Sequence, residues 1–218
     1  MSAYQRLVVD AFRLDLAAWQ RHGWSEHSFG RRSALKMLWH QAGLRATLLY
    51  RVAHWASVCH LPVLPSLLCQ VNIAVHAIEL PSNVPVGAGL YLPHTVGTVV
   101  NAEGIGSNAT IQGGVTVGMR TTPAFPLIGD NVILGAGCRV LGGIRLGDNV
   151  SVGANSVVIT DVPSGTTVVG IPGRAVHRIN ESARLGPATL VASTPHGPGD
   201  SRLGEGAELA ASRNIRAD

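Results

Sequence analysis

The stretch IGDNVILGAGCRVLGGIRLGDNVSVGANSVV, residues 128–158, decides the fold of this chain. An aliphatic residue returns in it every six positions, and the set is Ile128, Leu134, Val140, Leu146, Val152 and Val158. A helix repeats its apolar face about every 3.6 residues and a strand about every 2. A period of six instead predicts short strands joined by corners, with one large aliphatic side chain per segment pointing inward.

The same period extends upstream of this stretch. It passes through Ile105, Ile111 and Val117, and it appears again in the separate pair Val86 and Leu92. The step from Val117 to Ile128 is eleven residues, so a loop with five extra residues, 118–127, leaves the repeat there. We therefore predict a mainly β protein in which residues 78–178 form a parallel β-helix of hexapeptide repeats.

Residues 1–77 are predicted to be helical. Apolar residues at helical spacing favour helices over 4–20 and 33–60, with a loop over 22–32 and a break at Pro62 and Pro65. Polar residues interrupt the apolar segment 67–80, so we expect a buried or surface-seated helix there rather than a membrane span. A stack of β-coils exposes unpaired backbone groups at its ends, and we expect these helices to cap the first coil.

The last segment, residues 179–218, is rich in Gly, Pro, Ser and Ala and has little apolar periodicity. This composition predicts a flexible C-terminal tail.

Cysteines and charge restrict the class of protein. Cys59, Cys69 and Cys138 form neither an even disulfide set nor a zinc spacing, so we expect a reducing cytoplasm and a buried Cys138 thiol. The N-terminus lacks the layout of a secretion signal.

Residues 1–60 carry eight Lys and Arg against three Asp and Glu. This excess predicts either a solvated helix face or peripheral contact with the inner face of the membrane, and no motif accompanies it for nucleic acid.

His94 is the single histidine within residues 77–176, and it lies near a corner of the repeat. Glu79 precedes it by fifteen residues, close to one turn of eighteen, so the two side chains could stack on adjoining coils. A carboxylate beside an imidazole favours the protonated form that arises in base catalysis. A structural role at the corner is the alternative for His94.

Several segments resemble the serine acetyltransferase family, within the hexapeptide acyltransferases. They are Leu92-Pro93-His94-Thr95-Val96-Gly97, Ile111-Gln112-Gly113-Gly114-Val115-Thr116-Val117-Gly118, Leu134-Gly135-Ala136-Gly137-Cys138, Val152-Gly153-Ala154-Asn155-Ser156 and Val168-Val169-Gly170-Ile171-Pro172-Gly173-Arg174. The resemblance implies that the β-helix is left-handed. It also implies a homotrimer, or a dimer of trimers, with acetyl-CoA bound in a groove between subunits.

The resemblance further implies roles for single residues. His94 would act as general base on an acceptor hydroxyl, and Glu79 would orient it. Gly118, Ala136 and Ala154 would line the path of the pantetheine and thioester, and Arg174 would contact the nucleotide phosphates. Small residues let a cofactor approach the backbone, where amide groups can steady a developing oxyanion.

Two positions depart from the family pattern. Pro93 stands where the family has an acidic residue, and Ala124-Phe125-Pro126 stands where it has Arg-His-Pro, whose arginine helps to hold the serine carboxylate. The segment 48–55 also resembles exopolysaccharide acetyltransferases of the colanic-acid type. From these departures we expect a sugar or polysaccharide intermediate as acceptor, with serine O-acetylation for cysteine synthesis as the alternative.

Two further hypotheses concern a protein that is not an acetyltransferase. An inactive β-helix scaffold would keep the repeat without its chemistry. A carbonic-anhydrase-like metal protein would need three histidines on adjoining coils, and this repeat offers only His94, so we expect no metal.

Overall fold

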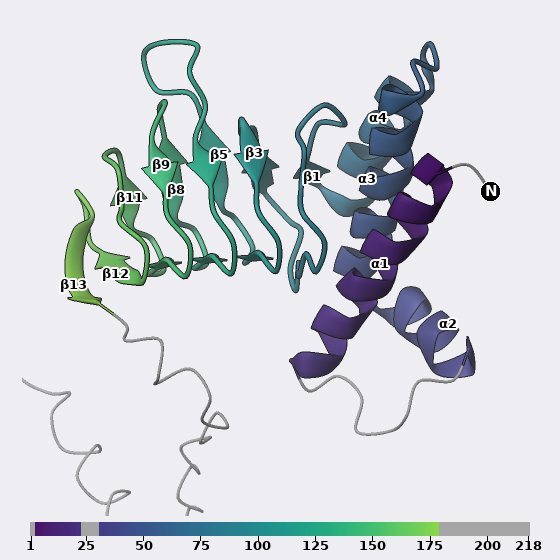
Figure 1. The fold of residues 1–218 in the computed structure, drawn as a ribbon, viewed down its shortest axis with the longest axis horizontal. Helices are drawn as coiled ribbons and strands as arrows, with labels where there is room; N and C mark the ends of the chain where they lie inside the picture. The colour runs from purple at the N-terminus through teal and green to yellow at the C-terminus, as the bar shows by residue number, and fades with distance from the viewer. Residues whose placement is uncertain (1–2, 23–30, 179–218) are drawn as a thin grey trace, which may run out of the picture. The chain divides into compact units, whose positions relative to one another are not determined.

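The computed structural model describes residues 3–22 and 31–178, which form a β-helix with α-helices at one end (Figure 1). The helices are α1 (Ala3–Arg21), α2 (Arg31–His40), α3 (Ala42–Val58) and α4 (Leu64–His76). The strands of the first half are β1 (Ile78–Glu79), β2 (Thr98–Val100), β3 (Gly104–Ile105), β4 (Thr110–Ile111), β5 (Thr116–Gly118) and β6 (Leu127–Ile128). Those of the second half are β7 (Ile133–Leu134), β8 (Arg139–Leu141), β9 (Arg145–Leu146), β10 (Ser151–Val152), β11 (Val157–Val158), β12 (Thr166–Val169) and β13 (Arg174–Arg178).

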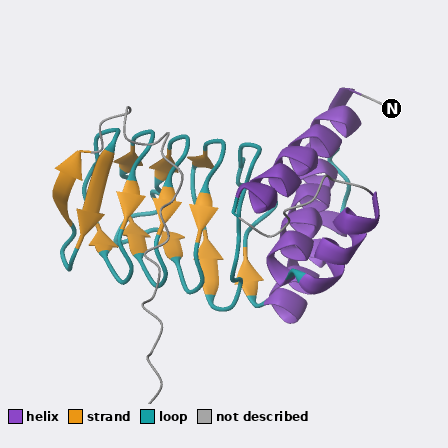
Figure 2. Ribbon diagram, turned by 90° about the horizontal axis from the view of Figure 1, so that it is seen from below, coloured by secondary structure: helices purple, strands orange, loops and turns teal. Residues whose placement is uncertain are grey.

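The strands form the three sides of a prism (Figure 2). Sheet A has the order β1-β2-β5-β8-β11, sheet B the order β3-β6-β9, and sheet C the order β13-β12-β10-β7-β4. Their neighbours pair in parallel, apart from the antiparallel pair of β12 and β13. The six-residue period is thus confirmed as a parallel β-helix.

The interior of the prism is aliphatic, as the period predicts. Ile128, Leu134, Val140, Leu146, Val152 and Val158 are each at most 2% exposed. Cys138 is also fully buried among them, and burial raises the pKa of its thiol to about 12. This thiol therefore stays protonated and unreactive at neutral pH.

The helices differ from the prediction in two places. The helix expected over 33–60 is two helices, because Gln41 has an extended backbone, with φ −101° and ψ 105°, between α2 and α3. Leu35, one of the apolar residues whose helical spacing in this segment predicts a core position, is 68% exposed. Pro65 lies in the first turn of α4, where a missing N–H costs no helical hydrogen bond, so α4 starts before the expected residue 67.

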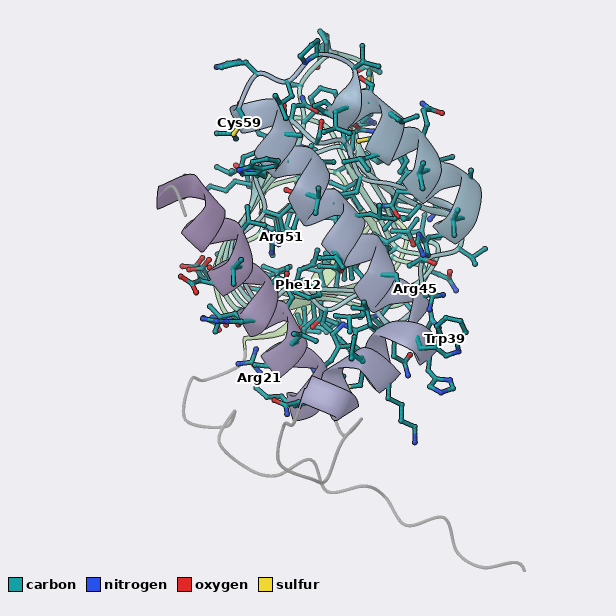
Figure 3. The ribbon with its side chains drawn as sticks, turned by 90° about the vertical axis from the view of Figure 1, so that its right-hand side faces the viewer. Phe12, Arg21, Trp39, Arg45, Arg51 and Cys59 are labelled. Carbon is teal, nitrogen blue, oxygen red and sulfur yellow. The ribbon has the colours of Figure 1, made fainter. Side chains whose placement is uncertain are left out.

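An arginine from α3 closes the open end of the prism. The Arg51 guanidinium donates to the backbone carbonyls of Val86 (2.6 Å) and Gly87 (2.7 Å) in the first coil and pairs with Asp15 of α1 at 2.9 Å. Asp15 Oδ1 in turn accepts hydrogen bonds from the backbone N–H groups of Gly89 and Leu90, both at 2.8 Å. Figure 3 shows Arg51 between α1 and α3. The predicted helical cap thus satisfies four backbone groups of the first coil.

The predicted tail, residues 179–218, and most of the predicted loop over 22–32 lie outside the described residues. Among the helices that the structure describes, none combines the length and the apolar character needed to cross a membrane.

Candidate active site

His94 lies at the corner between sheets C and A, and this corner is longer than those that follow it. From the sheet C position to the sheet A position, Tyr91 to Val99 is eight residues, whereas the equivalent Thr110 to Thr116 is six. The corner therefore holds two extra residues and bulges outward. His94 is exposed on it, and the neighbouring Val96 is 74% exposed.

The cap supports the coil that carries His94. A Cβ at Gly43 of α3 would lie only 1.7 Å from the Leu92 carbonyl oxygen, so the helix backbone packs directly on this coil. Trp19 of α1 packs edge-on against Tyr91, with ring centroids 4.8 Å apart. Residues immediately before His94 are therefore fixed by two helices, while the imidazole itself faces outward.

Small residues continue the His94 column along the corner. Strand pairing aligns Tyr91, Thr110, Ile133 and Ser151, and three residues further on it aligns His94 with Gly113, Ala136 and Ala154. A Cβ at Gly113 would lie 2.9 Å from the His94 Cβ, and the Asn155 N–H donates to the Ala136 carbonyl at 2.8 Å. Ala136 and Ala154 are exposed. One histidine thus stands at the head of a shallow column without large side chains.

The other two predicted cofactor residues are not members of this column. Gly118 ends β5 beside Leu141, and a Cβ there would meet no atom within 4 Å, so open space adjoins it. Arg174 begins β13, where its exposed guanidinium donates to the Gly173 carbonyl at 3.2 Å. The structure therefore does not gather all four predicted cofactor residues at one point of the single chain.

Glu79 has a different partner from the one expected. Strand pairing places it beside Val99, and its Oε1 accepts a hydrogen bond from the Asn101 side chain at 3.1 Å. Among the described residues, no hydrogen bond or ion pair joins Glu79 to His94. The pairing of these two side chains stays a prediction.

Arg139 is a neighbour of the column that the sequence analysis missed. It lies on β8, and its Nη1 donates to the carbonyls of Gly114 (2.7 Å) and Gly137 (2.9 Å) at the same corner. The guanidinium thus places positive charge beside the small residues. A signal was present in the sequence, because Arg139 directly follows the buried Cys138 and must point outward from the prism.

No group of three or more histidine, cysteine or acidic side chains within the described residues is arranged to hold a metal ion.

Comparison with known proteins identifies the chemistry that this scaffold serves elsewhere. Residues 125–160 match the family model described as bacterial transferase hexapeptide (six repeats). A serine acetyltransferase of Synechococcus elongatus is 40% identical over 151 residues, which are 67% of this chain and 62% of that protein. One of Staphylococcus epidermidis is 38% identical over 159 residues, 71% of this chain and 74% of that protein.

Solved structures point the same way. The serine acetyltransferase of Neisseria gonorrhoeae in complex with serine superposes with a TM-score of 0.70 and 30% identity, covering 78% of this chain and 69% of that one. The serine acetyltransferase of Brucella abortus in complex with coenzyme A has a TM-score of 0.70 and 26% identity, covering 79% of this chain and 68% of that one.

These relatives overturn the expectation of a sugar or polysaccharide acceptor. The curated relatives and the solved structures above are serine acetyltransferases, and the resemblance of residues 48–55 to colanic-acid enzymes is not supported. Ala124-Phe125-Pro126, from which a sugar was expected, does not by itself exclude serine. A carboxylate can be held by a cation from any element that lines a site, so one arginine missing from one loop does not exclude an amino acid.

Proposed function

We propose that this chain, which belongs to the serine acetyltransferase family, transfers the acetyl group of acetyl-CoA to the side-chain hydroxyl of serine. Membership of that family supports the predictions of an O-acetyltransferase and of acetyl-CoA as co-substrate. The acceptor is proposed from the serine named with the Neisseria gonorrhoeae structure. The structure favours this function over the hypothesis of an inactive scaffold, because a scaffold would not need an exposed histidine on a lengthened corner.

The column headed by His94 is the observation that carries this proposal. Gly113 has no side chain that could collide with the His94 Cβ. Ala136 and Ala154 add only a methyl group each on the next two coils, so the surface along the column stays shallow. An extended thioester arm could therefore lie along the corner with its reactive end at the imidazole. Arg139 beside the column and Arg174 near its far end are cations for the phosphates of the cofactor.

The proposed reaction needs one proton acceptor and no covalent enzyme intermediate. The serine hydroxyl oxygen attacks the thioester carbonyl carbon while the His94 imidazole takes the hydroxyl proton. The carbon–sulfur bond then breaks, and the CoA thiolate takes that proton from the imidazolium. Cys138 is no rival nucleophile, because it is buried and burial raises the pKa of its thiol to about 12.

Glu79 remains the proposed acidic partner of His94. It is exposed, and its Oε2 has no hydrogen-bond partner among the described residues while Oε1 is held by Asn101. We also propose the left-handed β-helix and the trimer that the family resemblance implies, together with three regions: helices over 1–77, the β-helix over 78–178 and the tail. The cytoplasm stays the predicted compartment, where acetyl-CoA and serine are both available.

Release of CoA from acetyl-CoA tests the proposal. We expect release to depend on L-serine, with O-acetylserine as product by mass spectrometry. Release that does not depend on L-serine, or that occurs only with sugars, would overturn the acceptor. D-serine is the matched control, since it carries the same groups in a geometry that a chiral site should reject.

A further inference from the structure

Helix α4 turns its apolar side away from the rest of the chain. The two side chains that it buries are polar, Asn72 and His76. Asn72 donates to the Ala46 carbonyl of α3 at 3.1 Å and pairs with the His76 imidazole at 2.9 Å. A surface helix normally has the reverse arrangement, with its polar side in water and its apolar side in the core. The outward side of α4 is therefore suited to contact with something less polar than water.

The exposed aliphatic side chains of α4 form a single ridge. Val63, Leu67, Val71 and Val75 follow one another at intervals of four residues and are 37% to 77% exposed. Residues four apart lie one above another on a helix, so Leu67, Val71 and Val75 make a row of roughly 12 Å. Val63 extends this row as the residue directly before the helix. We call these four residues the outer ridge.

Helix α2 adds an exposed apolar pair near the end of the outer ridge. Leu35 and Trp39 lie one turn apart and are 68% and 80% exposed. Arg45 of α3 donates to the Leu38 carbonyl at 3.1 Å and to the Trp39 carbonyl at 2.5 Å. Burial and, secondly, the charge of Arg45 lower the pKa of His76, so Arg45 also lies near the last turn of α4. Figure 3 shows Arg45 and Trp39 on the same side of the cap.

The surroundings of the outer ridge are basic. Residues 31–77, which include α2, α3 and α4, contain five Lys and Arg and no Asp or Glu. Arg51 is buried in the cap, whereas Lys36 is exposed and Arg45 is half-buried. The next acidic residue, Glu79, lies beyond α4 on β1. This part of the cap therefore combines exposed apolar side chains with positive charge.

This combination is complementary to the surface of an anionic lipid bilayer. Helices that lie in a membrane interface place apolar side chains such as Trp and Leu among the headgroups, while Lys and Arg attract anionic lipids. A second copy of the cap would instead bring the same positive charges against each other, and like charges across an interface disfavour association. The charge distribution thus favours lipid over a second copy.

We infer that the outer ridge, together with Leu35 and Trp39, is a docking surface for anionic phospholipid, by which the chain binds a membrane surface reversibly. The inference goes beyond the proposed function and does not depend on it, because no residue of this surface belongs to the His94 column.

Flotation with vesicles tests the docking surface. The full chain is mixed at low salt with vesicles of equal parts phosphatidylglycerol and phosphatidylcholine, or of phosphatidylcholine alone. We expect the anionic vesicles to bind the chain about tenfold more strongly or better, because each Lys or Arg near the surface is attracted to anionic lipid. High salt should release much of the bound chain by screening. No binding to either kind of vesicle, or equal binding to both, would overturn the proposal.

Leu67→Ser removes the central leucine of the outer ridge. Vesicle binding should weaken about fivefold or more, because less apolar surface enters the interface. The unfolding curve and CoA release should stay near wild type, since the side chain is exposed and outside the proposed active site. Leu14→Ser is the matched control, because Leu14 of α1 is 52% exposed, close to the 55% of Leu67, and lies outside the ridge. It should change vesicle binding less than twofold, and equal losses in the two variants would contradict the assignment.

Two further measurements separate lipid from a second copy. Vesicles with brominated acyl chains should quench the fluorescence of the wild-type chain, and Trp39→Phe should lose most of this quenching. Undiminished quenching in Trp39→Phe would remove Trp39 from the docking surface. Sedimentation velocity without lipid should give the same oligomeric state for wild type and Leu67→Ser. A smaller assembly in Leu67→Ser would show that the outer ridge is a contact between copies, and the proposal would fail.

Discussion

Among the described residues, the helical cap buries charged side chains, whereas the β-helix buries aliphatic and neutral polar ones. Inside the prism the repeated inward positions are aliphatic, and the polar and charged groups discussed above lie on its surface. In the cap, Arg51 and Asp15 are 4% and 0% exposed, whereas Leu67 and Val75 of α4 are 55% and 66% exposed. The reason is that each inner coil satisfies its backbone by pairing with two neighbours, while the first coil has only one and needs polar groups from the cap.

The difference predicts how the two regions respond to substitution. An exposed catalytic or binding side chain on the surface of the prism can be substituted without loss of stability. Polar groups buried in the cap cannot be removed without leaving other buried groups unpaired. Activity and stability should therefore separate by region, with the coil from Tyr91 to His94 as the place where the regions meet.

His94→Ala should give the largest effect on activity. Loss of the general base should lower kcat by about 10² to 10⁴. The free energy of unfolding should stay within about 0.5 kcal/mol of wild type, because the side chain is exposed and makes no hydrogen bond within the described chain. Steady-state CoA release and urea unfolding measure the two quantities. Activity within threefold of wild type would remove His94 as the base.

Arg51→Ala should give the opposite pattern. It leaves the Asp15 charge and the carbonyls of Val86 and Gly87 buried without their partner, so the free energy of unfolding should fall by about 3–5 kcal/mol. Urea unfolding measures the loss. Arg13→Ala is the matched control, because it breaks an exposed ion pair with Asp10 and should cost less than about 1 kcal/mol. Equal losses in the two variants would refute the role of Arg51 as a cap.

Ala136→Leu tests whether the column is a binding surface. A leucine side chain would rise from the middle of the column, so we expect KM for acetyl-CoA to increase about tenfold while KM for L-serine and stability change little. Ala136→Gly is the control, because it adds no side chain to the column, and it should leave KM for acetyl-CoA near wild type. An unaffected KM in Ala136→Leu would mean that the cofactor runs elsewhere.

Sequence reasoning could predict the prism because one residue per six determines its interior. It could also have found the lengthened corner, since Leu92 and Val100 are eight residues apart and both fully buried. It could not predict the pair of Arg51 and Asp15, which are 36 residues apart on different helices. No period relates two such positions, and only the packing of α1 on α3 brings them together.

The prediction of a sugar acceptor was wrong for a related reason. The prediction rested on the loop, where Ala124 offers no charge. Arg145 and Asp161 lie on later coils and line a pocket together with Ala124 of the loop, and only the register that aligns Leu127 with Arg145 shows this. In a coiled fold, residues about eighteen positions apart share a site, so a site must be sought down the stack as well as along the chain.

The smallest expected effect concerns pH and helix α4, which buries Asn72 and His76. His76 is 5% exposed; its Nδ1 is paired with Asn72 at 2.9 Å, and its Nε2 is buried without a partner among the described residues. Burial, and secondly the charge of Arg45, lower the pKa of His76. Below a pH of about 6.5 the unfolded chain therefore binds a proton that the folded chain refuses, and stability falls as the pH falls.

One proton gives a slope of at most about 1.4 kcal/mol per pH unit, which urea unfolding between neutral and mildly acid pH resolves. In His76→Leu the shape of the site is roughly kept and the titrating group is gone, so this part of the slope should disappear. An identical pH dependence in both proteins would show that the buried imidazole does not couple folding to protons. The prism offers no counterpart, because the one titratable group in its described interior, Cys138, stays neutral throughout this range.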